Sequence, residues 1–217
     1  MAKVYQLPCS RDVRAGAPVL GSPAKGAMMT SNDNAYRLGL VFAAALAAGC
    51  AIDVPTNANT FSIEPANAAH LGGAQAVAIR NGYAAPDVRE LRAGKGQTWR
   101  VEQKQLTDTA IAMLTRAMEQ QGVKTAAPAE KSITLLVRAT HGFIHQNAFS
   151  PIAHSNASIA LEVEFGDGTG TFVGADNNSP MGVQRAYDGA VLFALNRLLM
   201  DEKFVTYVRA KDATPPK

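Results

Sequence analysis

The side chain whose type and position most clearly indicate chemistry is the thiol of Cys50. It follows an uncharged apolar run, Leu38 to Gly49, and Arg37 places a positive charge just before that run. A run of this length is typical of the core of a secretory signal, and it is well short of the ~20 residues that cross a bilayer as a helix. The run therefore predicts an export signal that ends at a cysteine.

The residues at the end of the run, Leu46-Ala47-Ala48-Gly49-Cys50, resemble the lipobox of bacterial lipoproteins. The resemblance implies that the Cys50 sulfur takes a diacylglycerol and that cleavage before Cys50 exposes an amine, which is then acylated. Leu46 lies four residues before the cysteine, whereas the commonest pattern has leucine three before it. The alternative is a buried core helix with Cys50 as an ordinary apolar side chain, since free cysteine is among the most buried residue types.

Three histidines lie close together in the sequence: His141, His145 and His154. The spacing of the first two would put both imidazoles on one face of a helix, as in zinc enzymes. However, the segment from Thr140 to Ser155 contains glycine, proline and other turn formers, and it supplies no carboxylate or cysteine as a third ligand. We therefore expect a solvated loop and no metal site.

The remaining candidates for chemistry also have simpler interpretations. Gly166 to Gly170 could form a phosphate loop, but no lysine follows and no helix is expected to begin there, so a hairpin turn is favoured. No serine lies in a Gly-x-Ser-x-Gly motif. Trp99 and Tyr83 flank an Arg-rich segment where they could meet a partner or a glycan, although packing is the commoner role of single aromatic residues. The sequence thus predicts neither a catalytic constellation nor a cofactor.

The charge of the chain is unevenly divided at Cys50. The whole chain has a net charge of +3, and five basic and two acidic residues before Cys50 account for all of it. The part from Cys50 onward is therefore neutral, has no basic block and gives no electrostatic footprint for nucleic acid. If Cys50 carries lipid and Cys9 is removed with the signal, no cysteine remains for a disulfide.

Composition also suggests how the chain is organised. Residues 1–27 are rich in glycine, proline and alanine, and are either a disordered leader or the result of a translation start placed too far upstream, because Met28 and Met29 stand where a signal peptide would begin. The remaining parts are expected to be a lipoprotein signal peptide at 28–49, a tether and edge strand at 50–73, a periplasmic α+β domain at 74–210 and a flexible tail at 211–217.

Hydrophobic periodicity predicts the regular elements of that domain. Strands are expected at Thr60–Glu64, Gln75–Arg80, Thr98–Val101, Ile133–Thr140, Ile159–Phe165 and Thr171–Val173. Helices are expected at Leu106–Gln121, capped by Thr107 or Asp108, and at Pro180–Met200, capped by Ser179. Tyr83–Gly96 is expected to be an exposed loop, and Phe204–Arg209 a final turn or strand.

These elements predict an α+β fold with an antiparallel sheet of about four to six strands and two amphipathic helices on one face. Leu161 and Val163 should then share one core with Leu195 and Leu198, because the strand and the helix each have one apolar face that needs cover. Glu162 and Glu164 should lie on the solvated face of the sheet.

The order of signal, helix, strand, hairpin and final helix resembles the YajG family of bacterial lipoproteins. The resemblance runs from about Ala74 to Arg209 and lies in element order and scattered apolar positions. It implies a small periplasmic domain that lipid tethers to the outer membrane. Transport-auxiliary lipoproteins and the lipopolysaccharide-assembly lipoprotein have similar layouts.

Together these features predict a non-catalytic envelope lipoprotein that acts by binding or scaffolding. It would be anchored through lipid on Cys50 and would have an envelope protein as a possible partner. Ala51 follows the cysteine where, in enteric bacteria, an aspartate would signal retention on the inner membrane, so the outer membrane is expected. The alternatives are an accessory lipoprotein of a lipid or lipopolysaccharide transport system and an enzyme of cell-wall or lipid metabolism.

Overall fold

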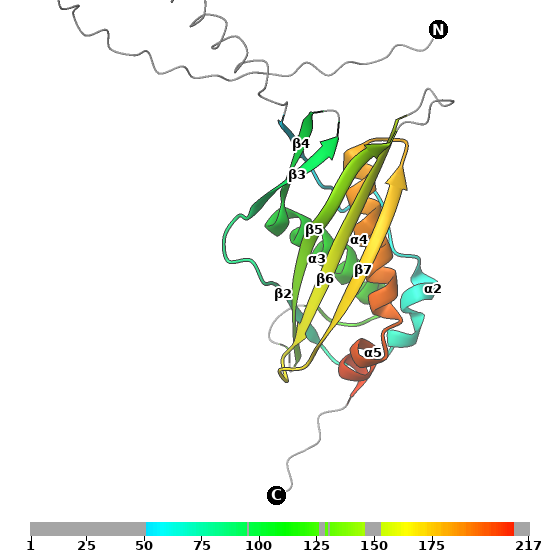
Figure 1. The fold of residues 1–217 in the computed structure, drawn as a ribbon. Coiled ribbons are helices and arrows are strands. Elements are labelled where there is room, and N and C mark those ends of the chain that lie inside the picture. Colours follow the sequence, from blue (N-terminus) through cyan, green and yellow to red (C-terminus); the bar gives the residue numbers. More distant parts are fainter. Residues whose placement is uncertain (1–50, 95, 126–128, 130, 146–152, 211–217) are drawn as a thin grey trace, which may run out of the picture. The chain divides into compact units, whose positions relative to one another are not determined.

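The structure, a computed structural model, describes residues 51–94, 96–125, 129, 131–145 and 153–210. The leader, the signal peptide, Cys50 and the C-terminal tail lie outside these residues, so the expectations about them stay predictions. Figure 1 shows the fold of the described part, in which long strands and two long helices predominate.

The strands form two sheets. The larger sheet has the order β2-β5-β6-β7, with β2 at Val77–Asn81, β5 at Lys131–His145, β6 at His154–Phe165 and β7 at Gly170–Ser179. The smaller has the order β1-β4-β3, with β1 at Ala51–Val54, β4 at Gln97–Glu102 and β3 at Val88–Gly94. The β1–β4 and β2–β5 pairs are parallel, and the other neighbours are antiparallel. The α+β class is confirmed, with the strands divided between two sheets.

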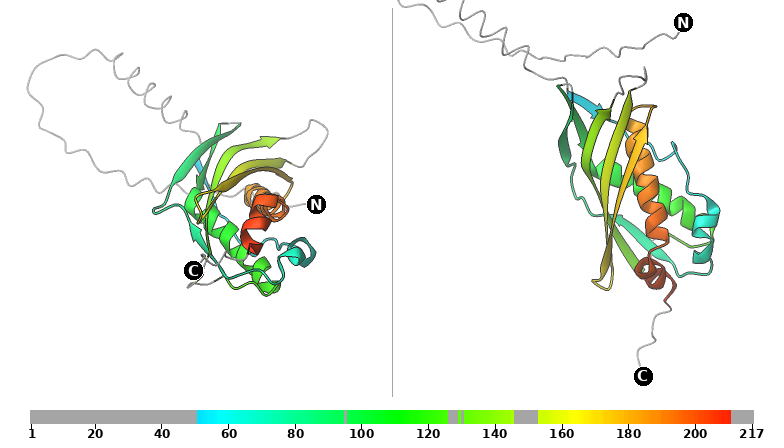
Figure 2. Two further views of the ribbon diagram at one scale, coloured as in Figure 1. Left: turned by 90° about the horizontal axis from the view of Figure 1, so that it is seen from below. Right: turned by 45° about the vertical axis from the view of Figure 1, so that its right-hand side comes forward.

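Two long helices cover one face of the larger sheet, as expected (Figure 2). They are α3 at Gln103–Gln120 and α4 at Val183–Leu199. The cap of α3 is Glu102, whose carboxylate accepts hydrogen bonds from two backbone N–H groups, and not Thr107 or Asp108. Helix α4 begins after Gly182 and not at Pro180, because Ser179 is the last residue of β7.

The predicted core is confirmed. Leu161 and Val163 of β6 are buried in one cluster with Leu195 and Leu198 of α4. Glu162 and Glu164 are exposed on the opposite face of β6. The period-two pattern of the strand therefore faces the helix as its sequence predicts.

The turn between β6 and β7 is a hairpin, as predicted. The Phe165 N–H donates to Thr169 O, the Gly168 N–H donates to Phe165 O, and Gly168 has φ of 82°. A three-residue connection that ends in a left-handed glycine has this pattern. The Thr169 hydroxyl and N–H both donate to Asp167, and these bonds lower the pKa of the Asp167 carboxyl.

The N-terminal segment differs from the expected tether. Ala51–Val54 forms β1, and Thr60–Glu64 is not a strand but leads into a short helix, α2 at Pro65–Ala68, and a 3-10 turn at Ala69–Leu71. Proline at the start of α2 has the fixed φ of a helix and lacks the N–H that a first turn would leave unbonded. The segment is therefore part of the folded domain.

Two other expectations were wrong. Tyr83–Gly96 is not only a loop, because it contains β3, whose outward residues are charged and so hide the strand pattern. Phe204–Arg209 lies in a helix, α5 at Glu202–Arg209. Asp201 caps α5 by accepting from the Lys203 and Phe204 N–H groups, and Phe204 and Val208 bury its apolar side.

Candidate functional site

The candidate lipidation residue, Cys50, lies outside the described residues, but the residue after it is already part of the fold. Ala51 is the first residue of β1 and pairs with Thr98 of β4. The parallel register continues to Val54, which is buried and pairs with Val101. The chain therefore enters the domain as a sheet strand.

Trp99 is the largest buried side chain of the smaller sheet, which joins the common core through Val54, Ala93, Trp99 and Val101. This side chain is buried and makes an edge-to-face contact with Tyr187 of α4, with ring centroids 6.2 Å apart. It also lies against Gly142 of β5, where an added Cβ would come within 2.5 Å of the indole ring. The Tyr187 hydroxyl donates to His141 O at 3.2 Å, and burial raises the pKa of Tyr187. Trp99 thus has the packing role, and Gly142 makes room for it.

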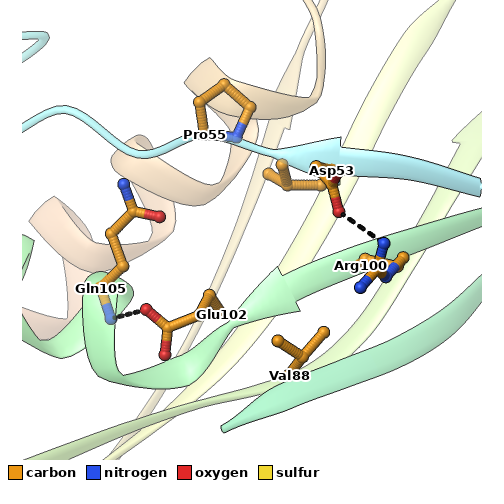
Figure 3. A pocket seen from close by; sticks show the side chains of 7 residues that line it. Asp53, Pro55, Val88, Arg100, Glu102 and Gln105 are labelled. Carbon is orange, nitrogen blue, oxygen red and sulfur yellow. Dashed lines mark hydrogen bonds and ion pairs between the residues drawn. The ribbon is translucent and has the colours of Figure 1, made fainter. Parts of the chain in front are cut away.

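A groove of about 460 Å³, which we call the sheet groove, lies on the outer face of the smaller sheet (Figure 3). Its residues come from β1 and the segment after it, from β3, β4 and α3; they are Asp53, Val54, Pro55, Val88, Arg100, Glu102 and Gln105.

The charged groups of the sheet groove bond to one another and to the backbone. Arg100 Nη1 lies 3.3 Å from Asp53 Oδ1, and its Nε lies 3.9 Å from Glu90 Oε1. Glu102 accepts from the Lys104 N–H at 2.9 Å and from the Gln105 N–H at 2.8 Å. These contacts link β1, β3 and β4 at the surface and cap α3, so the charged groups of the groove are bonded within the fold. The lining between them is mostly apolar.

A second groove, of about 420 Å³, lies beside α4 and the edge strand β7; we call it the helix groove. Its lining residues are Asn67, Asp176, Phe193, Asn196, Arg197 and Met200. Phe193 is 45% exposed and Met200 64% exposed. The Arg197 guanidinium donates to Gly174 O of β7. The groove therefore combines exposed apolar side chains with a polar edge.

Asp188 is a buried carboxylate on α4 that the sequence reasoning missed. It accepts from the Asn57 N–H at 3.1 Å and from the Thr60 hydroxyl at 2.7 Å. Burial raises its pKa, and the hydrogen bonds from Thr60, Asn57 and Gln184 oppose that shift. The signal that could have revealed it is an acidic residue inside the apolar stripe of α4, beside Tyr187. Asp188 holds the segment after β1 against α4.

The three histidines lie in strands and not in a loop as expected, although His141 and His145 are exposed. Residues 146–152 of the expected loop lie outside the described residues. His141 and His145 belong to β5, and His154 belongs to β6. His145 and His154 are register partners, and His154 Nδ1 lies 3.1 Å from Asn178 Oδ1. The helical spacing that suggested zinc therefore does not exist. Among the residues that the structure describes, no group of three or more His, Cys, Asp or Glu side chains could hold a metal ion.

No helix in the described ranges has the length and apolar character that crossing a membrane requires.

The solved structures similar to this chain include the crystal structure of protein XCC0632 from Xanthomonas campestris, assigned to the family DUF330. It is 13% identical, the match covers 73% of this chain and 95% of that one, and the TM-score is 0.40. A likeness this weak carries no argument about family or activity. No family model and no curated protein matches the chain.

Proposed function

We propose that the protein is a lipoprotein of the bacterial cell envelope, anchored by lipid on Cys50 and acting by binding or scaffolding without catalysis. The observation that carries the proposal is the adjacency of the lipobox-like sequence and the fold. The lipobox-like sequence ends at Cys50, and the next residue, Ala51, already belongs to strand β1. Cleavage before Cys50 would release a chain that consists of one lipidated cysteine followed directly by the fold.

The strength of such an anchor follows from its chain length. Each buried methylene contributes ~0.8 kcal/mol, and a single myristoyl chain gives only marginal binding to a bilayer. Three acyl chains on Cys50 would therefore hold the domain on the membrane stably. The finer expectation, a YajG-like lipoprotein on the periplasmic face of the outer membrane, rests on the sequence resemblance and on Ala51 in the position after the cysteine.

A binding role is supported by how the domain uses its charged groups. Arg100 and Asp53 form an ion pair between two strands, and Glu102 caps α3. Asp188 is engaged by the Asn57 N–H and the Thr60 hydroxyl. Each of these groups has a role in holding the fold together, which leaves the two grooves as surfaces for a ligand or protein partner.

The anchor is tested with a matched pair of cysteine variants in a bacterial host. Cys50→Ala should abolish labelling by radioactive palmitate and leave an uncleaved or soluble precursor, whereas Cys9→Ala should be labelled and processed as the wild type is. Mass spectrometry of the mature N-terminus should find a cleaved, acylated Cys50. An unmodified Cys50 in the mature chain, or equal labelling of both variants, would refute the proposal.

The location is tested by fractionating membranes on a density gradient. The wild type should sediment with outer-membrane markers, and Ala51→Asp should shift toward inner-membrane markers in an enteric host. Wild-type protein that co-sediments with inner-membrane markers would contradict the outer-membrane assignment and leave the lipid anchor standing.

A second candidate function, an accessory role in lipid or lipopolysaccharide transport, is favoured by the exposed Phe193 and Met200 of the helix groove. It predicts that the lipidated protein purified from native membranes carries bound lipid that Phe193→Ser reduces. Phe172→Ser is the matched control, because Phe172 is 66% exposed and does not line the groove. Equal lipid in both variants would count against this role.

A further inference from the structure

The chain enters the domain at one end, which we call the entry end. It comprises Ala51 and Ile52 of β1, the neighbouring residues of β3 and β4, and the last residues of β5, Phe143 to His145. The residues of β3 and β4 are Arg92, Gly94 and Gln97. Ala51 pairs with Thr98, and the next row outward is the Gly94–Gln97 pair. Figure 1 and the right-hand view of Figure 2 place the start of β1, the adjoining ends of β3 and β4, and the end of β5 at the same end of the domain.

The end of β5 is fixed at this level by packing. Trp99, the register partner of Ile52, lies against Gly142 of β5, and Phe143 follows Gly142. The opposite end of the domain carries the β6–β7 turn and α5. Strand β5 alone has 15 residues, which at ~3.3 Å per residue spans about 50 Å, so the two ends are well separated.

No flexible spacer exists between a lipid on Cys50 and this end. Consecutive Cα atoms are about 3.8 Å apart, so the Cα of Cys50 lies within about that distance of β1. The headgroup layer on each side of a bilayer is about 5–8 Å thick, from the difference between the ~30 Å hydrocarbon core and the ~40–45 Å total. A residue this close to the lipid attachment lies at the edge of the headgroup layer.

Side chains at the entry end are suited to that position. Ile52 is 36% exposed and Phe143 is 38% exposed, although both are large and apolar. Arg100, further along β4, is paired with Asp53 and Glu90. Contact with headgroups would cover the apolar surface of Ile52 and Phe143 and leave these ion pairs in place.

We propose that the entry end rests directly on the headgroups of the bilayer, with Ile52 and Phe143 against the lipid and α5 directed away from it. This inference rests on the proposed lipid anchor at Cys50 and goes beyond it, because an anchored domain with a spacer could take any orientation. The occupant of this surface is a lipid membrane.

The test uses the fact that the mature lipidated chain would have no free thiol, since Cys50 is modified and Cys9 is removed. Single cysteines are introduced by Phe143→Cys or Arg92→Cys at the entry end, by Thr206→Cys on α5 and by Phe172→Cys on the outer face of the larger sheet. Each is labelled with an environment-sensitive fluorophore in the full lipidated protein, reconstituted in vesicles of phosphatidylethanolamine and phosphatidylglycerol that carry a nitroxide-quencher lipid.

Quenching by the nitroxide lipid should be several-fold stronger at positions 143 and 92 than at 206 and 172. Phe143→Cys alters a packed residue. If this variant fails to fold, Arg92→Cys, which changes an exposed residue, provides the same measurement. Equal quenching at 92 and 206 would overturn the proposal, and the strongest quenching at 172 would show that the domain lies on its side instead.

A spacer variant separates the role of the short connection from that of the anchor. A copy of Ala51 and about twelve Gly and Ser residues are inserted after Cys50, which adds a mean reach of about 20 Å. Co-flotation with vesicles should be unchanged, while quenching at position 92 should fall several-fold; unchanged quenching would contradict the proposal.

Mass spectrometry of the same samples shows whether Cys50 is acylated. An unmodified Cys50 refutes the lipid anchor, whereas an acylated Cys50 without quenching at position 92 of the protein that lacks the spacer refutes only the orientation.

Discussion

The two sheets of this domain are stabilised in different ways. The larger sheet buries a continuous apolar face, with Leu161 and Val163 of β6 against Leu195 and Leu198 of α4. The smaller sheet buries only Val54, Ala93, Trp99 and Val101 among its described residues, and Trp99 makes its contact with Gly142 of β5 and Tyr187 of α4. The chain after β1 depends on Asp188, a buried polar contact.

The larger sheet therefore supplies most of the stability, whereas the smaller sheet is the one next to the proposed anchor. Each Å² of apolar surface that is buried contributes about 25 cal/mol to stability, so the larger sheet with its continuous apolar face is the main source of stability. The described part of the domain has no cysteine that could add a disulfide. The smaller sheet, which carries the chain from the proposed anchor, is held by a few specific contacts. We therefore expect the smaller sheet to loosen separately when these contacts are removed, and the larger one to fail only with the whole domain.

The largest effect is expected at Trp99. Trp99→Ala should lower the free energy of unfolding by about 3–5 kcal/mol, because it empties the site between Gly142 and Tyr187. Hydrogen exchange should accelerate most in β1 and β4, and much less in β6. Trp99→Phe should lower the free energy of unfolding by less than Trp99→Ala does. If hydrogen exchange in Trp99→Ala accelerates as much in β6 as in β1 and β4, the two sheets are not separable.

The second-largest loss of stability is expected in the core of the larger sheet. Leu161→Ala should lower the free energy of unfolding by about 2–5 kcal/mol and should raise exchange throughout the domain. The adjacent Glu162→Ala is the matched control, because Glu162 is half exposed and pairs with Arg138 at 3.1 Å on the solvated face. Its change should stay within about 0.5 kcal/mol. Urea denaturation that finds Glu162 the more sensitive residue would refute this assignment of faces.

A smaller effect is expected from filling the space at Gly142. In Gly142→Ala the new methyl would come within 2.5 Å of the Trp99 ring and 2.7 Å of the Tyr187 hydroxyl, so these groups must move. Overpacking of this kind destabilises by about 1–3 kcal/mol.

The matched control for Gly142 is Gly174→Ala in β7, where no heavy atom lies within 4 Å of an added Cβ. Thermal melts should leave this variant as stable as the wild type or slightly more stable, since alanine restricts the unfolded chain more than glycine does. A similar loss in both variants would mean that the Trp99 contact is not what makes Gly142 necessary.

The last effect, similar in size to that at Gly142, concerns Asp188 and depends on pH. Asp188→Asn should cost about 1–3 kcal/mol, because one of the Asn57 and Thr60 donors loses its acceptor. Burial raises the pKa of Asp188 above 3.8, so protonation adds stability that is fully present below that value and is lost as pH rises through the folded-state pKa.

The asparagine side chain does not titrate in this range, so the cost of Asp188→Asn should be larger near pH 4 than near pH 7. Urea denaturation at both values measures the difference. A cost that grows with rising pH would show that the hydrogen bonds from Asn57 and Thr60 outweigh the effect of burial.

The sequence by itself was enough for the elements whose own residues carry a full periodic pattern. Helices α3 and α4 and strands β5 and β6 each have an apolar stripe long enough to show the spacing of their secondary structure. Their assignment to one shared core followed from those stripes. Strand β7 was expected only at Thr171–Val173, from the turn before it. The candidate anchor, Cys50, also came from local sequence, because an export signal is read as an extended peptide before folding.

Only the tertiary structure decided the elements whose stability comes from neighbours. β1 is four residues long and β3 presents charged residues, so neither shows a strand pattern; pairing with β4 supplies their hydrogen bonds. The burial of Asp188 and the need for glycine at 142 likewise depend on residues far away in the chain, Thr60 and Trp99. The reason is physical: a periodic apolar face is a property of one segment, whereas a parallel edge strand, a buried carboxylate and a close contact each require a partner that local sequence does not specify.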